Sequence, residues 1–512
     1  MKNLLKRILN LDVESTLFSC LIVFCGMFLY RCFNSIYIIS DTIEHMQASL
    51  AVYQGMVPYR DFFEHHNPLL WYLFAPISNL FYGNANIIKI YRIIGVCIYF
   101  LCIYVFYRIN AKYIYKDKKI SLFSVLFLIS VPALWDDANL RPDSFMLLFF
   151  LIGCKMYFDY LKQNKTRYLV FSYLSMSISF LFLQKILFCL LSFGIINLYD
   201  LLKKHIKLPD FIIACAIGGL PIALFVSVLL YMGIFADYIY YNYTFNTLMV
   251  KYYDGHLLAP YLLSVSAIIT FLIIIRTYKY SPQTALFALC FILSALSLIY
   301  FSPLTPYYLT YFLMASSLLA PVLYKYRTKG STCLISALFI ISILFSVPKT
   351  EEKANYISLE KTSKCFIDEN LSNDVLDFSN ATFNLFKPIQ NYYWFGWPLV
   401  HVDLWNNKNR NFDINEYIKQ TNHKYLIIPE HYGTLLPNDM INIHAKWFRD
   451  MNFNLMMSRP KDIPLDEFIA KRTHHIQYDI WGIDKEYIAK NYTKGTICSM
   501  EVYIKNDEGE EQ

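Results

Sequence analysis

Residues 40–70, SDTIEHMQASLAVYQGMVPYRDFFEHHNPLL, follow directly on an apolar run, 17–38, that is long enough to span a membrane. The stretch holds many ionisable side chains for a segment beside a membrane helix: Asp41, Glu44, His45, Arg60, Asp61, Glu64, His65 and His66. Carboxylates and imidazoles packed this closely beside an apolar helix need water or one another as partners. We therefore expect loop 39–86 to be the polar outer loop in which any chemistry is concentrated.

The composition excludes an ordinary soluble protein. Of the 512 residues, 56% are hydrophobic and only 17% are charged, whereas about a quarter of the residues in a soluble protein are charged. The net charge of +7 is spread over many short loops, and without a basic stripe it predicts no nucleic-acid partner. The chain is expected to be a polytopic α-helical membrane protein.

About eleven apolar runs have the length of a membrane span. They lie near 17–38, 87–108, 119–135, 143–161, 168–183, 186–200, 211–233, 258–276, 283–301, 306–324 and 331–347. The run 68–83 is shorter and contains Pro76, which favours an interfacial or re-entrant helix. The basic start of the chain precedes a run with no small-residue cleavage site, so the first span is expected to be retained.

The distribution of Lys and Arg predicts the orientation. Nineteen lie in the N-terminal segment and the alternate loops that follow it, and four lie in the other loops. By the positive-inside rule, the N-terminus is cytoplasmic and loop 39–86 faces outward. With an odd number of spans, the polar region that follows lies outside as well.

The chain divides into a transmembrane domain, 1–347, and a soluble extracytoplasmic α+β domain, 348–512. Strand-like runs occur in the second domain at 424–429 and 499–504. Cys365 and Cys498 bracket this domain and are expected either to pair in an oxidising compartment or to remain two free thiols. The ten other cysteines lie in apolar segments, as is typical of small buried hydrophobic residues.

The first candidate site is the acidic pair Asp41 and Glu44, which helical spacing places on one face. The same spacing is typical of a capping box, with Gly55 ending the helix. Both interpretations are compatible, because a capping carboxylate is also held rigidly.

A second candidate is the motif PYRDFFEHHNP, 58–68. Asp61 and Glu64 are suited to a divalent ion, and His65 or His66 to the same ion or to a phosphate. Arg60 lies in the same acceptor or metal vicinity. The alternative is a loop whose polar groups face water.

Two further groups are candidates for binding phosphate. In 135–144, Arg141 would clamp a phosphate beside Asp136, Asp137 and Asp143, unless the four form a closed ion cluster. Lys185 is a single cation in an apolar turn, and it either snorkels to the interface or binds a ligand.

Aromatic residues are grouped at two predicted outer positions. Tyr307 and Tyr308 begin an outward helix end, and segment 235–246 reads FADYIYYNYTFN. Both are typical of an interfacial aromatic belt, and stacked aromatic rings also suit sugars.

These residues together resemble the GT-C superfamily of membrane glycosyltransferases, particularly the bacterial protein O-mannosyltransferase-like and lipid A aminoarabinose transferase-like enzymes. The resemblance rests on Asp41 after the first span, the motif from Ala51 to Leu70, LRPD at 140–143, Lys185, and TPYYL at 305–309. It covers roughly residues 10–330. The chain departs from many relatives in reading Asp-Thr-Ile-Glu where adjacent acidic residues are common.

The resemblance implies a GT-C-like fold in the bacterial cell (inner) membrane and transfer of a sugar from a polyprenyl-phosphate donor. The acceptor would be a lipid, glycan or protein, with membrane lipid around the site. Asp41 would be the base with Glu44 assisting, and Glu64 and His65 would lie near a divalent Mg, Mn or Zn ion. The donor phosphate would bind Arg141, Lys185, Tyr307 and Tyr308.

Two other functions fit a polytopic protein with a charged outer loop. A glycolipid flippase or transporter would line a pathway with charges, but no inverted repeat is evident. A polysaccharide polymerase or ligase would place its ionisable residues in a late outer loop, whereas here they come early. A plain membrane anchor would need no such loop.

Overall fold

The computed structural model describes Gly26 and residues 40–82, 84, 86–129, 140–247, 282–300, 364–366, 368–371, 374–377, 414–428 and 483–506. Most of the chain up to residue 300 in these ranges is helical. Its α-helices are α3 (Ser40–Tyr53), α4 (Leu69–Leu80), α5 (Asn86–Ile109), α6 (Lys118–Ile129), α7 (Pro142–Gln163), α8 (Thr166–Phe182), α9 (Leu187–Leu202), α10 (Leu208–Tyr231), α11 (Phe235–Ile239) and α14 (Pro282–Tyr300).

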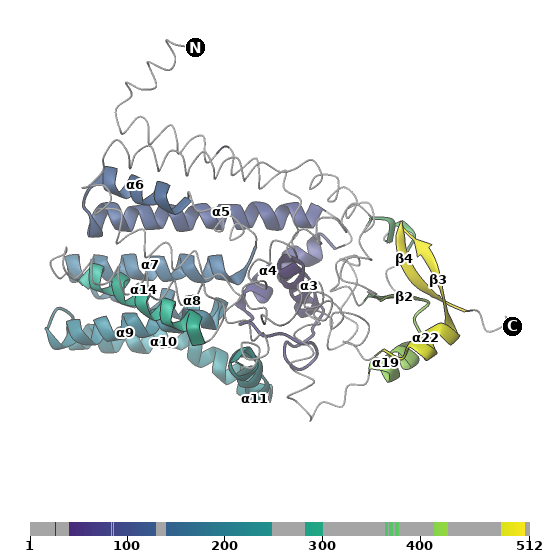
Figure 1. Ribbon diagram of the computed structural model, residues 1–512. Helices are drawn as coiled ribbons and strands as arrows, with labels where there is room; N and C mark the ends of the chain where they lie inside the picture. The colour runs from purple at the N-terminus through teal and green to yellow at the C-terminus, as the bar shows by residue number, and fades with distance from the viewer. Residues whose placement is uncertain are drawn as a thin grey trace, which may run out of the picture.

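The long helices run side by side as a bundle, while α3 and α4 lie together at one end of it (Figure 1). Within the described residues, four helical segments are long and apolar enough to cross a membrane: Asn86–Ile114, Pro142–Gln163, Gln184–Leu202 and Leu208–Tyr231. Most apolar side chains of α10 are exposed, as on a lipid-facing helix. The protein is therefore a polytopic membrane protein, as the composition predicts.

The predicted spans agree with these helices where the structure describes them. Helices α5, α7, α9 and α10 coincide with four predicted spans, and α6, α8 and α14 overlap three more. Four predicted spans, 17–38, 258–276, 306–324 and 331–347, lie outside the described residues apart from Gly26. The run 68–83 forms the short helix α4, with Pro76 inside it.

Helix α8 lies between α7 and α10 because small residues allow close approach on both of its faces. Ser172 Oγ donates to the carbonyl of Gly153 on α7 at 2.7 Å, and Ser177 donates to the carbonyl of Gly218 on α10. A Cβ added at Gly218 would lie 2.3 Å from Cβ of Tyr173. Small residues and hydroxyl bonds of this kind are typical of helix packing within membranes.

Helix α3 begins two residues earlier than the capping-box interpretation requires. Asp41 is the second residue of the helix rather than the residue before it, since the helix begins at Ser40. The predicted end is confirmed: Gly55 has φ +88°, and its amide donates to the carbonyl of Val52. The amide of Met56 donates to the carbonyl of Ala51, which completes a Schellman motif.

The opposite end of the bundle carries three buried aspartates, each bonded to a tyrosine hydroxyl. The pairs are Asp159 with Tyr113, Asp200 with Tyr157, and Asp210 with Tyr160. The lysines of the loops at this end, such as Lys162, Lys203 and Lys204, are exposed. Because these carboxylates are bonded internally, the surface here is basic, as the charge distribution predicts for cytoplasmic loops.

The C-terminal region contains a four-stranded sheet of strand order β1-β2-β4-β3, which lies beyond the end of the bundle that carries α3 and α4 (Figure 1). Its strands are β1 (Val375–Asp377), β2 (Tyr425–Ile427), β3 (Tyr492–Ile497) and β4 (Met500–Lys505). Strands β1 and β2 are parallel, and the other pairs are antiparallel. Helices α19 (Ile414–Thr421) and α22 (Lys485–Asn491) contribute Ile418 and Ile488 to the core on one face. The strand-like runs 424–429 and 499–504 are thus confirmed.

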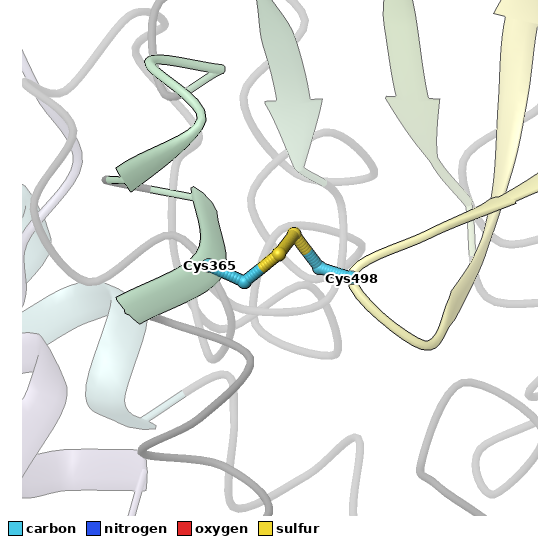
Figure 2. The surroundings of a disulfide bond; sticks show 2 residues. All are labelled: Cys365 and Cys498. Carbon is cyan, nitrogen blue, oxygen red and sulfur yellow. A yellow bond between two sulfur atoms is a disulfide. The ribbon is translucent and has the colours of Figure 1, made fainter.

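Cys365 and Cys498 form a disulfide that ties a short helical turn to the β3–β4 hairpin (Figure 2). This resolves the choice between pairing and two free thiols. The hairpin turn consists of Cys498 and Ser499, with φ +52° and +64°, a conformation that favours Gly or Asn. The disulfide therefore holds a turn whose two residues have little intrinsic preference for it. The described cysteines of the bundle are free thiols, and Cys97 and Cys215 are exposed rather than buried.

We expect Cys365→Ser to lower the free energy of unfolding of the sheet by about 2 to 5 kcal/mol, because the cross-link spans many residues and holds the hairpin turn. Proteolysis of the full-length protein in increasing urea, followed at cleavage sites after residue 363, measures the change. Cys215→Ser, an exposed free thiol on α10, should leave the urea midpoint unchanged. Equal midpoints for the two variants would show that the disulfide adds no stability.

Candidate functional site

Four ionisable side chains meet where α3 contacts the loop that follows it. Glu44 comes from α3, and Glu64, His65 and His66 come from the loop before α4. One candidate ligand atom from each lies within 4.8 Å of the others. Nδ1 of His66 is 3.4 Å from Oε1 of Glu44 and 3.4 Å from Oε2 of Glu64. Glu44 and Glu64 are only 2% and 1% exposed, so this carboxylate–imidazole cluster lies inside the protein.

His45 and Tyr59 form hydrogen bonds beside the cluster. Nε1 of Trp71 donates to Nδ1 of His45 at 3.1 Å, so this imidazole nitrogen must be unprotonated. The hydroxyl of Tyr59 donates to the carbonyl of His66 at 2.6 Å. Burial raises the pKa of Tyr59 well above its ordinary value, and the phenol therefore stays neutral and keeps its donor.

Asn67 connects the loop to two distant helices. Its amide nitrogen donates to the carbonyl of Phe180 on α8, and its amide oxygen accepts from the hydroxyl of Tyr238 on α11 at 3.0 Å. Asn67 is fully buried, so neither bond competes with water. Asn67 thus anchors the end of residues 65–67, which we call the histidine segment.

The carbonyl of His65 accepts hydrogen bonds from two other segments. Nε2 of Gln184 donates to it at 3.1 Å from the 3-10 helix η3 (Gln184–Ile186), and Nδ2 of Asn246 donates at 3.1 Å. Asn246 directly follows the π-helix η4 (Tyr240–Phe245). A π-helix often marks a functional position.

The aromatic segment 235–246 packs into the protein instead of forming an interfacial belt, which corrects that expectation. Tyr238, Tyr241 and Phe245 are buried. The ring of Phe63 lies edge-to-face against Tyr241 and Phe245, with centroids 5.5 and 5.3 Å away. These contacts fix the loop on the side opposite Trp71.

Arg60 and Asp61 pair with each other rather than joining the carboxylate–imidazole cluster. Both carboxylate oxygens of Asp61 accept from the Arg60 guanidinium at 2.8 Å, and Oδ2 also accepts from the amide of Val57 at 2.7 Å. These hydrogen bonds from Arg60 hold the pKa of Asp61 below its ordinary value. Asp61 therefore stabilises the conformation of the loop.

Two of the four predicted phosphate ligands, Arg141 and Lys185, lie in described segments. Arg141 is the residue before α7 and is buried, with Nε 3.4 Å from Oδ2 of Asp143. This contact joins two of the four residues of the expected ion cluster, and the side chains of the other two lie outside the described residues. Lys185 is half-buried in η3, directly after Gln184. The bond from Gln184 to His65 therefore brings the Lys185 backbone beside the histidine segment.

Several candidate residues lie where the structure does not describe their side chains. They are Asp41, Asp136, Asp137, Tyr307 and Tyr308. Asp41 is placed only as part of α3, one turn before Glu44. Its role as a base stays a prediction.

Sequence reasoning gave no role to three residues that shape the site: Asn67, Gln184 and Asn246. Each of the three amides forms at least one bond to a residue more than one hundred positions away, and no local pattern reveals such partners. The only signal was a polar residue in an otherwise apolar run, as for Gln184 beside Lys185.

The cluster has the donor set of a transition-metal site. Two carboxylate oxygens and two imidazole nitrogens suit Zn²⁺ or Mn²⁺ better than Mg²⁺, which prefers oxygen ligands and water. Tetrahedral ligands about 2.1 Å from a metal lie about 3.4 Å apart. The candidate ligand atoms of the cluster lie within 4.8 Å of one another. They would have to move only slightly closer together to bind one ion.

Comparisons with known proteins give similarity to solved structures but no sequence match. No family model matches the sequence, and no curated protein matches it. Among solved structures, the chain is similar to the crystal structure of ArnT from Cupriavidus metallidurans bound to undecaprenyl phosphate. The identity is 11%, the TM-score is 0.48, and the alignment covers 97% of this chain and 99% of that one. This match assigns no role to any residue of the chain.

We expect Asn67→Leu to destabilise the protein by about 2 to 4 kcal/mol, because it leaves the Phe180 carbonyl and the Tyr238 hydroxyl buried without their partner. Thermal unfolding of the purified protein measures the loss. Tyr238→Phe removes a single donor and should cost about 1 kcal/mol. If Asn67→Leu were as stable as the wild type, the anchor would have no energetic role.

Proposed function

We propose that this protein is a membrane glycosyltransferase that moves a sugar from a polyprenyl-phosphate donor to an acceptor hydroxyl on the outer face of the membrane. The observation that carries the proposal is the buried cluster of Glu44, Glu64, His65 and His66, at one end of a bundle of apolar helices. A purely structural loop has no need to bury two carboxylates beside two imidazoles, since each buried charge costs solvation energy.

The chemistry requires little beyond positioning. The acceptor oxygen attacks the anomeric carbon while the bond from that carbon to the phosphate oxygen breaks, and the configuration inverts. The hydroxyl proton passes to a carboxylate, for which Asp41 is our candidate with Glu44 one turn away on α3. The departing polyprenyl phosphate keeps the electron pair and needs positive charge nearby. Arg141 and Lys185 are the proposed sources.

A divalent cation in the cluster would offset the two carboxylates and add positive charge for the phosphate. We propose that Glu44, Glu64, His65 and His66 hold it. Tyr59 and Gln184 hold the segment that carries the two histidines through its backbone carbonyls.

Two observations support an outward-facing site. The Cys365–Cys498 disulfide favours an oxidising compartment for the C-terminal sheet. The sheet lies beyond the same end of the bundle as α3 (Figure 1). Basic loops lie at the other end, where exposed lysines such as Lys162 and Lys203 are found. We therefore propose that the N-terminus is cytoplasmic and that residues 348–512 cover the site and contact the acceptor.

We expect cells without the protein to lack one sugar on a surface glycolipid, glycan or protein. Wild type should restore the sugar. Asp41→Asn at equal protein level should transfer it at less than about a hundredth of the wild-type initial rate, because the loss of one general base has an effect of this size. Mass spectra of the surface glycans measure this. Asp61→Asn is the matched control, since that carboxylate pairs with Arg60.

Three outcomes of the same spectra would change the proposal. Full restoration by Asp41→Asn would remove Asp41 as the base. Unchanged glycans in cells without the protein would contradict the transferase function. Accumulation of complete glycolipid on the inner leaflet would indicate a flippase.

We expect purified wild-type protein to bind about one Zn²⁺ or Mn²⁺ per chain. Glu64→Gln should weaken this binding at least tenfold, because it removes one charged ligand. Elemental analysis after dialysis, and titration with Co²⁺ followed by absorption, measure the stoichiometry and affinity. Asp61→Asn should bind like the wild type. Equal binding by Glu64→Gln would place the metal elsewhere.

A further inference from the structure

Gln184 is the point at which three segments far apart in sequence meet. Its Nε2 donates to the carbonyl of His65 at 3.1 Å and to the carbonyl of Asn242 at 3.3 Å. It thereby connects the turn between α8 and α9 to the histidine segment and to η4. Gln184 is 5% exposed, so water competes little for these bonds.

The orientation of this amide follows from its neighbours. Both are carbonyl oxygens, which accept hydrogen bonds and cannot donate, so the nitrogen must face them. Oε1 then faces away from them, and it is buried without a donor among the described protein residues. An amide in this orientation fixes the backbone with its nitrogen and leaves an acceptor for a hydroxyl group or water.

The bond to His65 acts at a sensitive position. The His65 carbonyl belongs to the peptide unit that joins the two imidazoles, whose ring centroids lie 4.0 Å apart. A rotation of this unit would move both rings relative to Glu44 and Glu64. Asn246 supports the same carbonyl with a second donor at 3.1 Å, so the two amides together prevent the rotation.

We infer that Gln184 is a positioning residue that holds the His65–His66 peptide in the geometry in which both imidazoles face Glu44 and Glu64. The inference rests on the proposed function only for its consequence in sugar transfer. Because Lys185 follows Gln184 in η3, the same turn also holds the proposed phosphate ligand in place relative to the histidines.

The experiment measures how fast diethylpyrocarbonate modifies each histidine of the full-length purified protein, with a chelator present so that no cation protects the rings. His65 and His66 are buried, while the side chain of His205 is 51% exposed at the far end of the bundle. His205 therefore serves as the internal reference. We expect Gln184→Leu to raise modification of His65 and His66 relative to His205 by about five- to tenfold, the effect of one or two lost hydrogen bonds.

Asn197→Leu is the matched control. Asn197 is a buried amide on α9 whose Nδ2 donates to the carbonyl of Phe193, a bond within the helix. The substitution removes a buried amide of similar cost without touching the histidine segment. It should leave the ratios of His65 and His66 to His205 unchanged. Asn246→Leu, which removes the second donor, should raise the ratios and serves in place of Gln184→Leu if that variant does not fold.

Each outcome has a distinct meaning. Unchanged ratios in Gln184→Leu, or the same rise in Asn197→Leu, would overturn the positioning role. A selective rise confirms it. The amount of surface glycan that Gln184→Leu restores is measured in parallel. At equal protein level it should be lower than the amount that the wild type restores. If cells without the protein had normal glycans, the proposed function would fail while the modification result still decided the role of Gln184.

Discussion

The burial of two carboxylates beside one imidazole nitrogen is the constraint on which this end of the molecule depends. Glu44 and Glu64 each lie 3.4 Å from Nδ1 of His66, in a region closed to water. Buried charges are tolerated only where opposite charge or hydrogen bonds compensate them. The surrounding structure must therefore keep the histidine segment within reach of both carboxylates.

That requirement explains why several hydrogen bonds, most of them long-range, hold residues 65–67 in place. Tyr59, Gln184 and Asn246 donate to carbonyls of this segment, and Asn67 binds α8 and α11. Tyr59, Gln184 and Asn246 bind backbone carbonyls, so these hydrogen bonds fix the peptide without engaging the imidazole and carboxylate atoms of the cluster.

Sequence reasoning reached the elements whose signals are local. Apolar runs located helices such as α5 and α10, and Gly55 marked the end of α3, because length, hydropathy and backbone freedom are properties of neighbouring residues. It failed where residues far apart in the sequence determine the structure. The aromatic segment around Tyr241 was expected at the membrane interface but packs on the first loop. Likewise, the sequence identified Cys365 and Cys498 as the candidate pair but left open whether they bond, since that depends on how close the fold brings the two thiols.

The two ends of the bundle differ in the partners of their buried acidic residues, and the difference supports the proposed position of the site. At the basic end, Asp159 accepts from Lys112 and Tyr113, and Asp200 from Tyr157. These are fixed partners that complete the packing of helix ends. At the end of α3, the carboxylates face imidazoles, which accept a proton or bind a cation at neutral pH. A protein that needed only stability could have used hydroxyl and ammonium donors at both ends. The basic end also holds an imidazole, since His205 lies beside Asp200. Among the described residues, however, two carboxylates and two imidazoles converge only at the end of α3, and that convergence supports the proposed site.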